Sequence, residues 1–173
     1  TGGSGKKPLN NNKRSDTKST SFIIMKKEMR ARNLHLVPEE CKIQLRTNRT
    51  GGLGAGSNPE IGKMAAEESR EEIKKALEGI DLLFITAGMG GGTGTGAAPV
   101  IAKIARDMKI LTVAVVTEPF DFEGKKRMEN TVKGLENLKK YVDTPIVLPN
   151  DKIRTVVPKT TPMKEAPRVA EEI

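Results

Sequence analysis

Apolar positions along the chain fall into two patterns, short continuous runs and longer stretches with helical spacing. The runs at 22–25, 42–45, 82–85, 110–116 and 146–148 predict strands. Helical spacing covers 59–79, 97–108 and 124–141, and another helix is predicted to begin at Thr161. From residue 80 onward strands and helices alternate. This order predicts an α/β fold, a three-layer Rossmann-like domain whose mostly parallel sheet carries helices on both faces.

Two of these elements have sharper signatures. Asn58 precedes Pro59 as a capping residue before a proline at the first helical position, and Gly79 is suited to end that helix. The run 110–116 contains no polar residue except Thr112, which is typical of a strand buried on both faces.

Between the strand at 82–85 and the helix at 97–108, residues 88–96 read Gly-Met-Gly-Gly-Gly-Thr-Gly-Thr-Gly. Glycine leaves backbone N–H groups bare, so they can converge on an anion, and a helix N-terminus favours negative charge. Thr93 and Thr95 add hydroxyl donors. The pattern predicts a phosphate-binding loop, and therefore a nucleotide.

Common glycine-rich motifs of other kinds match residues 88–96 less well. A Walker A loop ends in Gly-Lys-Ser/Thr, and the chain has no such run. In a dinucleotide fingerprint the acidic ribose-binding residue would fall at 112–116, inside an apolar strand. A flexible glycine linker is not usually bracketed by an apolar strand and an apolar helix.

A second glycine run, 51–56, leads into the helix that begins at Pro59. In parallel sheets ligands bind at the carboxyl ends of the strands. The loops expected at that edge are 88–96, 117–123 and 149–151.

Charge and composition argue against two further kinds of site, one for nucleic acid and one for zinc. The net charge is +8, and residues 1–50 account for it with 12 Lys and Arg against 4 Asp and Glu. This basic part lacks the interleaved aromatic residues that stack on bases, so a solvated basic segment is favoured and no nucleic-acid partner is expected. With one cysteine, Cys41, and one histidine, His35, the chain offers no ordinary zinc site, and a reducing cytoplasmic setting is the simplest interpretation.

The two glycine runs are followed by Phe120–Arg127 and by Pro149–Lys152. This set, in this order, resembles the FtsZ family of prokaryotic tubulin-like cell-division GTPases, most densely from about Thr50 to Thr161. The resemblance implies a GTP-binding body at 22–161. It also implies a basic polar segment at 1–21, in place of the first phosphate loop and helix, and the start of a core helix at 162–173.

The resemblance also implies roles for individual residues. Those expected at the phosphates are Ala55, Gly56, Gly91, Gly92, Thr93, Gly94 and Thr95, with Gly3, Ser4, Gly5, Lys6 and Lys7 of the N-terminal segment. Those expected at the ribose and base are Glu123, Arg127, Asn150 and Glu172. Glu28 is the expected magnesium residue.

Some positions depart from the family's pattern. Lys6 and Lys7 replace asparagines, Lys26–Glu28 replaces Asn-Thr-Asp, and Pro167 stands where a phenylalanine usually stacks on guanine. The loop that orients the hydrolytic water in the family lies beyond Ile173. No residue of this chain is therefore expected to be catalytic, and the chain alone is expected to be inactive.

The function implied is GTP or GDP binding with magnesium, and head-to-tail polymerisation coupled to GTP hydrolysis at the inner face of the division-site membrane. Membrane tethers and other division proteins are implied as partners of parts outside this chain. The alternative is a degenerate, non-hydrolysing relative that binds nucleotide weakly or not at all.

Overall fold

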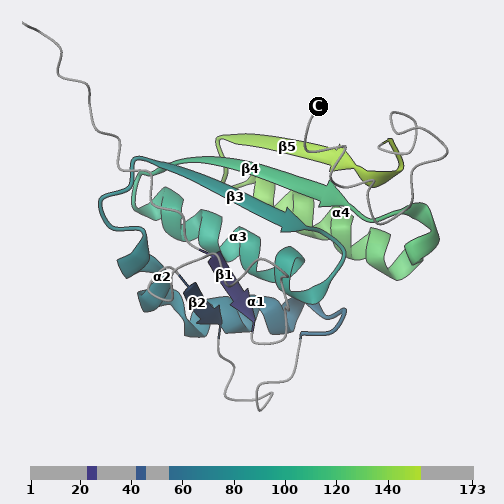
Figure 1. Ribbon diagram of the computed structural model, residues 1–173, viewed down its shortest axis with the longest axis horizontal. Coiled ribbons are helices and arrows are strands. Elements are labelled where there is room, and N and C mark those ends of the chain that lie inside the picture. Colours follow the sequence, from purple (N-terminus) through teal and green to yellow (C-terminus); the bar gives the residue numbers. More distant parts are fainter. Residues whose placement is uncertain (1–22, 27–41, 46–54, 153–173) are drawn as a thin grey trace, which may run out of the picture.

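The computed structural model describes residues 23–26, 42–45 and 55–152 (Figure 1). The strands are β1 (Ile23–Lys26), β2 (Lys42–Leu45), β3 (Leu82–Gly88), β4 (Leu111–Glu118) and β5 (Thr144–Pro149). The helices are α1 (Pro59–Glu68), α2 (Arg70–Ala76), α3 (Gly92–Asp107) and α4 (Lys125–Lys139), with a short 3-10 helix, η3, at Asp121–Glu123. Each strand expected in the described part of the chain is present within a few residues of its expected place.

The described strands form two parallel sheets. One has the order β3-β4-β5, with Ile85 opposite Ala114 and Val115 opposite Ile146, and the other pairs β1 with β2. Helices α3 and α4 connect consecutive strands of the larger sheet and lie on the same side of it (Figure 1). The predicted α/β class with parallel strands is confirmed.

The three-stranded sheet is buried on one face. Side chains that point toward the helices are covered, among them Ile85 at 7% exposure and Val116 at 0%. Their neighbours on the opposite face are open, with Phe84 61% and Leu111 54% exposed. The prediction that 110–116 is buried on both faces is wrong. Among the described residues helices cover only one face, so an apolar strand alternates between a covered and an open side.

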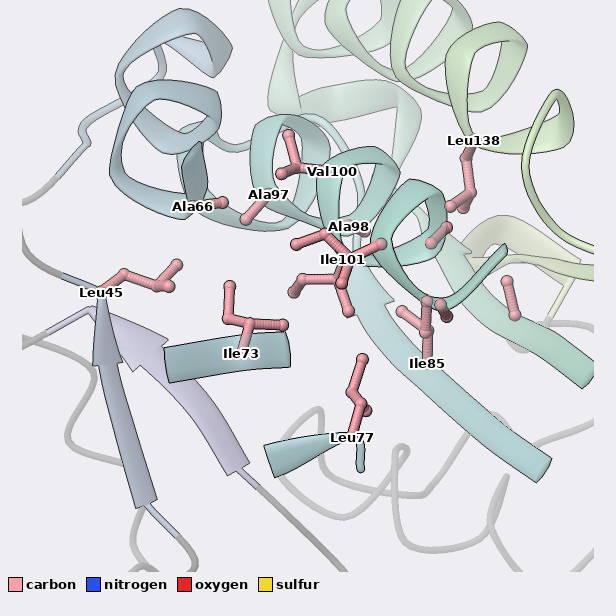
Figure 2. Close-up of a cluster of buried hydrophobic side chains, with 14 of the residues drawn as sticks. Leu45, Ala66, Ile73, Leu77, Ile85, Ala97, Ala98, Val100, Ile101 and Leu138 are labelled. Carbon is pink, nitrogen blue, oxygen red and sulfur yellow. The ribbon is translucent and has the colours of Figure 1, made fainter. Parts of the chain in front are cut away.

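Helix α3 is the centre of the core (Figure 2). Eleven of its residues are buried, and it lies between the larger sheet and α1. The same hydrophobic cluster includes Leu45 of β2 and Ile73 of α2. A single apolar core therefore joins both sheets and fixes the orientation of α3.

The stretch 59–79, expected as one helix, forms two. Asn58 caps α1, since its side-chain oxygen accepts from the N–H of Glu60 at 3.1 Å, and Gly79 ends the segment at φ +75°. The break is at Ser69, a buried residue with φ −93° and ψ 13°. Serine is a poor residue for a helix interior because its hydroxyl competes for backbone hydrogen bonds. The buried positions keep helical spacing across this break, from Ala66 through Ser69 to Ile73.

The expectations for 1–21, for 162–173 and for the helix from Thr161 lie outside the described residues. Within the described part of the chain, no helix is long and apolar enough to cross a membrane.

Candidate functional site

The carboxyl ends of the three paired strands lie at one edge of the sheet. Gly88 of β3 is opposite Thr117 of β4, and Glu118 is opposite Pro149 of β5. The segments that follow these residues therefore leave the sheet side by side. This is the edge at which the sequence predicted a ligand site.

Helix α3 begins at Gly92 with Gly91 as its N-cap, five residues before the predicted start at Ala97. Most of the glycine run is therefore the first turn of a helix rather than a free loop. Of the described residues, no side chain caps this N-terminus. The N–H groups of Thr93 and Gly94 lack intrahelical acceptors by position. The positive end of the helix dipole thus lies at the edge of the sheet.

The two glycine runs are in direct contact. The N–H of Gly92 donates to the carbonyl oxygen of Gly56 at 3.0 Å. A Cβ at position 92 would lie 2.7 Å from Ala55 Cβ and 2.8 Å from the carbonyl oxygen of Asn58. Glycine at 92 is therefore required by the close approach of the turn at 55–58. The structure brings Ala55 and Gly56, two of the residues expected at the phosphates, to the α3 N-terminus.

Further bonds fix the segment between β3 and α3. Met89 donates its N–H to the carbonyl oxygen of Thr117 at 2.9 Å. The N–H of Gly90 donates to Thr95 Oγ1 at 2.8 Å, and Thr95 is only 3% exposed. Thr95 therefore holds the loop in place from inside, whereas Thr93 is partly exposed.

The loop after β4 is ordered by one carboxylate. Glu123 Oε1 accepts from the N–H of Phe120 at 2.9 Å, and its other oxygen pairs with Arg127 one turn along. The side chain of Glu123 is 23% exposed and that of Arg127 is 43% exposed. The predicted ribose-binding pair is thus present at the edge, with each side chain held by the other.

The loop after β5 joins the same edge. Asn150 directly follows the strand and is partly buried. Its neighbour Asp151 accepts from the N–H of Asp121 at 3.0 Å, which ties this turn to η3. Asn150 and Glu123 therefore belong to adjoining segments at this edge.

Asn130 is a buried residue of the site that was not predicted from the sequence. It is 6% exposed, and its amide nitrogen lies 2.9 Å from the carbonyl oxygen of Ser57 and 3.4 Å from that of Gly90. The one signal in the sequence is a polar side chain on the inward face of α4, between Arg127 and Gly134.

Several expected site residues lie outside the described residues: Gly3, Ser4, Gly5, Lys6, Lys7, Glu28 and Glu172. Among the residues that are described, no three His, Cys, Asp or Glu side chains gather as a metal site. A hollow of about 340 Å³ lies on α2, lined by Glu71, Lys74, Lys75 and Glu78. Arg70 of α2 pairs with Asp107 at the far end of α3, so this hollow is remote from the glycine runs.

These features define a class. A parallel α/β sheet with an uncapped, glycine-rich helix N-terminus at its carboxyl edge is typical of proteins that bind phosphate-bearing ligands. Residues 9–158 match the model of the Tubulin/FtsZ family, GTPase domain. The chain belongs to the Tubulin/FtsZ family.

Solved structures agree with this assignment. An empty FtsZ dimer from M. jannaschii is 52% identical with a TM-score of 0.72, over 82% of this chain and 41% of that one. A mutant FtsZ from M. jannaschii is 55% identical with a TM-score of 0.70, over 76% and 39% of the two chains. GDP-bound CetZ1 from Haloferax volcanii is 25% identical with a TM-score of 0.68, over 79% and 42%. The chain thus spans about two-fifths of the solved structures it matches.

Proposed function

We propose that this chain binds GTP and GDP at the carboxyl edge of its sheet and supplies the nucleotide-binding half of an FtsZ-like GTPase. The observation that carries the proposal is the contact between Gly92 and Gly56. It holds a glycine-rich turn against an uncapped helix N-terminus, which is a suitable place for a polyphosphate. The GDP bound to the related CetZ1 supports the same choice of ligand.

In this proposal the phosphates lie at the N–H groups of Gly91, Thr93 and Gly94, with the Thr93 hydroxyl as a further donor and the turn at 55–58 beside them. Glu123 and Arg127 face the ribose and Asn150 faces the base. The buried Thr95 contributes by holding Gly90. Gly3, Ser4, Gly5, Lys6, Lys7 and Glu172 remain proposed nucleotide contacts.

We propose magnesium as a companion of the nucleotide. Magnesium prefers oxygen ligands and usually binds through phosphates, water and one or two carboxylates. In this proposal the phosphate oxygens bind the ion, and Glu28 is the proposed carboxylate ligand. The ion would neutralise phosphate charge.

Hydrolysis and assembly complete the proposal. Phosphoryl transfer to water requires a group that orients the water. We assign that group to a second subunit, so that the active site forms by head-to-tail association, the geometry that generates open filaments. The dimer of the related FtsZ supports self-association. The filaments would act in the cytoplasm at the division site, where membrane tethers and division proteins bind other parts of the protein.

A fluorescence titration of the 173-residue chain with mant-GTP tests nucleotide binding. We expect saturable binding in the micromolar range that GTP and GDP displace and ATP does not. The variant Thr93→Val removes one hydroxyl donor to a charged group and should weaken binding about tenfold. Thr144→Val, an exposed change at the amino end of β5, is the matched control. An absence of binding at millimolar nucleotide would contradict the proposal and favour the degenerate, non-binding relative.

A further inference from the structure

Asn130 connects three elements that are distant in the sequence. From the inward face of α4 its amide nitrogen contacts Ser57 O at 2.9 Å and Gly90 O at 3.4 Å. An amide –NH2 group has two hydrogens, so one side chain can donate to both carbonyl groups. One of these belongs to the turn before α1 and the other to the loop before α3. Both segments flank the proposed phosphate site.

The turn at 55–58 makes few other hydrogen bonds. Its backbone is closed by the N–H of Asn58, which donates to Ala55 O at 3.1 Å, and Gly56, Ser57 and Asn58 are exposed. Among the described residues, two hydrogen bonds join this turn to α3 and α4. The N–H of Gly92 donates to Gly56 O, and the side-chain amide of Asn130 donates to Ser57 O. Without Asn130 the turn would keep one hydrogen bond to α3, the one that Gly92 donates, beside the packing of the buried Ala55.

The loop before α3 rests directly on α4. Gly90 adopts φ +92°, and a Cβ at this position would lie 3.1 Å from both Arg127 O and Thr131 Oγ1. Thr131 Oγ1 itself donates to Arg127 O at 2.9 Å. The first turns of α4 thus form a firm support for the loop. Asn130 extends this support to the turn at 55–58.

We propose that Asn130 is a positioning residue that holds the turn at 55–58 and the loop at 88–92 at a fixed separation, and thereby sets the affinity for nucleotide phosphates. The inference rests on the proposed function, since it concerns the same edge of the sheet. Asn130 acts through the backbone of both segments and does not itself touch the ligand. The two N–H donors of its side-chain amide are what hold the two segments.

Two substitutions of similar volume isolate those donors. Asn130→Asp replaces the –NH2 group with an oxygen that faces two carbonyl oxygens, and Asn130→Leu leaves an apolar side chain there. Asn137→Asp is the matched control, because Asn137 is exposed on the same helix and its Oδ1 accepts from Lys140. A role in filling space would be retained by leucine, whereas a role in donating would be lost in both variants.

Hydrogen exchange of the nucleotide-free chain, followed by NMR, tests the attachment itself. We expect the amide of Gly92 to exchange about tenfold faster in Asn130→Asp and Asn130→Leu, because its bond to Gly56 O loses its support. The core amides of Ile104 and Ala105 should keep their protection, and Asn137→Asp should match the wild type. Unchanged exchange at Gly92 would overturn the inference. So would a loss of protection at the core amides as well, since Asn130 would then serve only global stability.

Titration with mant-GDP and mant-GTP tests the consequence. Both Asn130 variants should bind about tenfold more weakly than the wild type, while their core amides keep their protection and so report a folded chain. Wild-type affinity in Asn130→Leu would overturn the inference while leaving the proposed function intact. A wild-type chain that binds neither nucleotide would refute the proposed function, and the hydrogen exchange would still decide whether Asn130 couples the two segments.

Discussion

The N–H of Gly92 donates to the carbonyl oxygen of Gly56, and this bond joins the two glycine runs of the chain. The approach is so close that a Cβ at position 92 would lie 2.7 Å from Gly56 O. Gly91, the preceding residue of the run, has open space where a Cβ would be. Glycine therefore serves different purposes at adjacent positions of one motif.

The substitution Gly92→Ala tests this difference. The methyl group would meet the backbone of the turn at 55–58, which has to move, and overpacking of this kind typically costs about 1–3 kcal/mol. We expect that loss in the free energy of unfolding by urea, together with weaker mant-GTP binding. Gly91→Ala should cost less than about 1 kcal/mol, since only an N-cap preference is lost. Equal losses in the two variants would show that the contact does not constrain the run.

The one-sided burial of β3 leads to a second prediction. Ile85 is 7% exposed and faces the helices, whereas its neighbour Phe84 is 61% exposed on the open face. Ile85→Ala should lower the free energy of unfolding by about 2–5 kcal/mol, the range for a buried aliphatic side chain. Phe84→Ala should cost under about 1 kcal/mol, because little more than strand preference is lost. A larger loss for Phe84 than for Ile85 would contradict the described orientation of the strand.

A third prediction concerns the end of α3. Lys109 has φ 61°, and the N–H groups of Lys109 and Ile110 donate to Arg106 O and Ala105 O. These two bonds form a Schellman motif, which favours glycine at the left-handed position. Lys109→Gly should therefore raise the free energy of unfolding by about 1 kcal/mol. The same change at the exposed Lys103, inside α3, should lower it by about 1 kcal/mol. The melting temperatures of the two variants show whether each change stabilises or destabilises the chain.

The pair of Glu123 and Arg127 provides a fourth prediction. Glu123→Gln keeps an oxygen that accepts from the N–H of Phe120 but removes the ion pair with Arg127. Because the Arg127 side chain is 43% exposed and the pair is screened by solvent, the stability should change by less than about 1 kcal/mol. If the carboxylate binds ribose hydroxyls, mant-GTP affinity should fall about tenfold. Glu129→Gln, an exposed change in α4, is the control. A stability loss without an affinity loss would assign Glu123 to the loop alone.

The fold could be predicted from the sequence where a local pattern decides it. The apolar runs identified β3, β4 and β5, and Asn58 with Pro59 identified the start of α1. The break at Ser69 and the open face of β4 could not be predicted. The helical spacing of apolar residues continues through Ser69 and so hides the break, and the face of β4 that helices cover depends on packing that the apolar run does not specify.

The candidate site could likewise be predicted only where a local pattern specifies it. The glycine run predicted a ligand site at this edge of the sheet, because glycine spacing is a local property. The start of α3 at Gly92 was missed, since glycine is a poor helix former and its helical conformation here depends on contacts with α1 and β3. Asn130 was missed because its partners, Ser57 and Gly90, come from two other segments. The sequence of α4 shows a polar residue there and not what it contacts.

The last prediction concerns hydrolysis. Residues Gly91–Thr95 at the α3 N-terminus offer N–H and hydroxyl donors, which stabilise phosphate charge, but no carboxylate or amide side chain of the kind that orients an attacking water. The purified chain should therefore bind mant-GTP and yet release no phosphate above a protein-free blank, with magnesium present. Binding and release should be measured on the same preparation, so that a misfolded sample is recognised by its failure to bind. Phosphate release that rises in proportion to chain concentration would show that this chain contains its own water-orienting group. Release that rises more steeply than concentration would instead support an active site completed by a second copy.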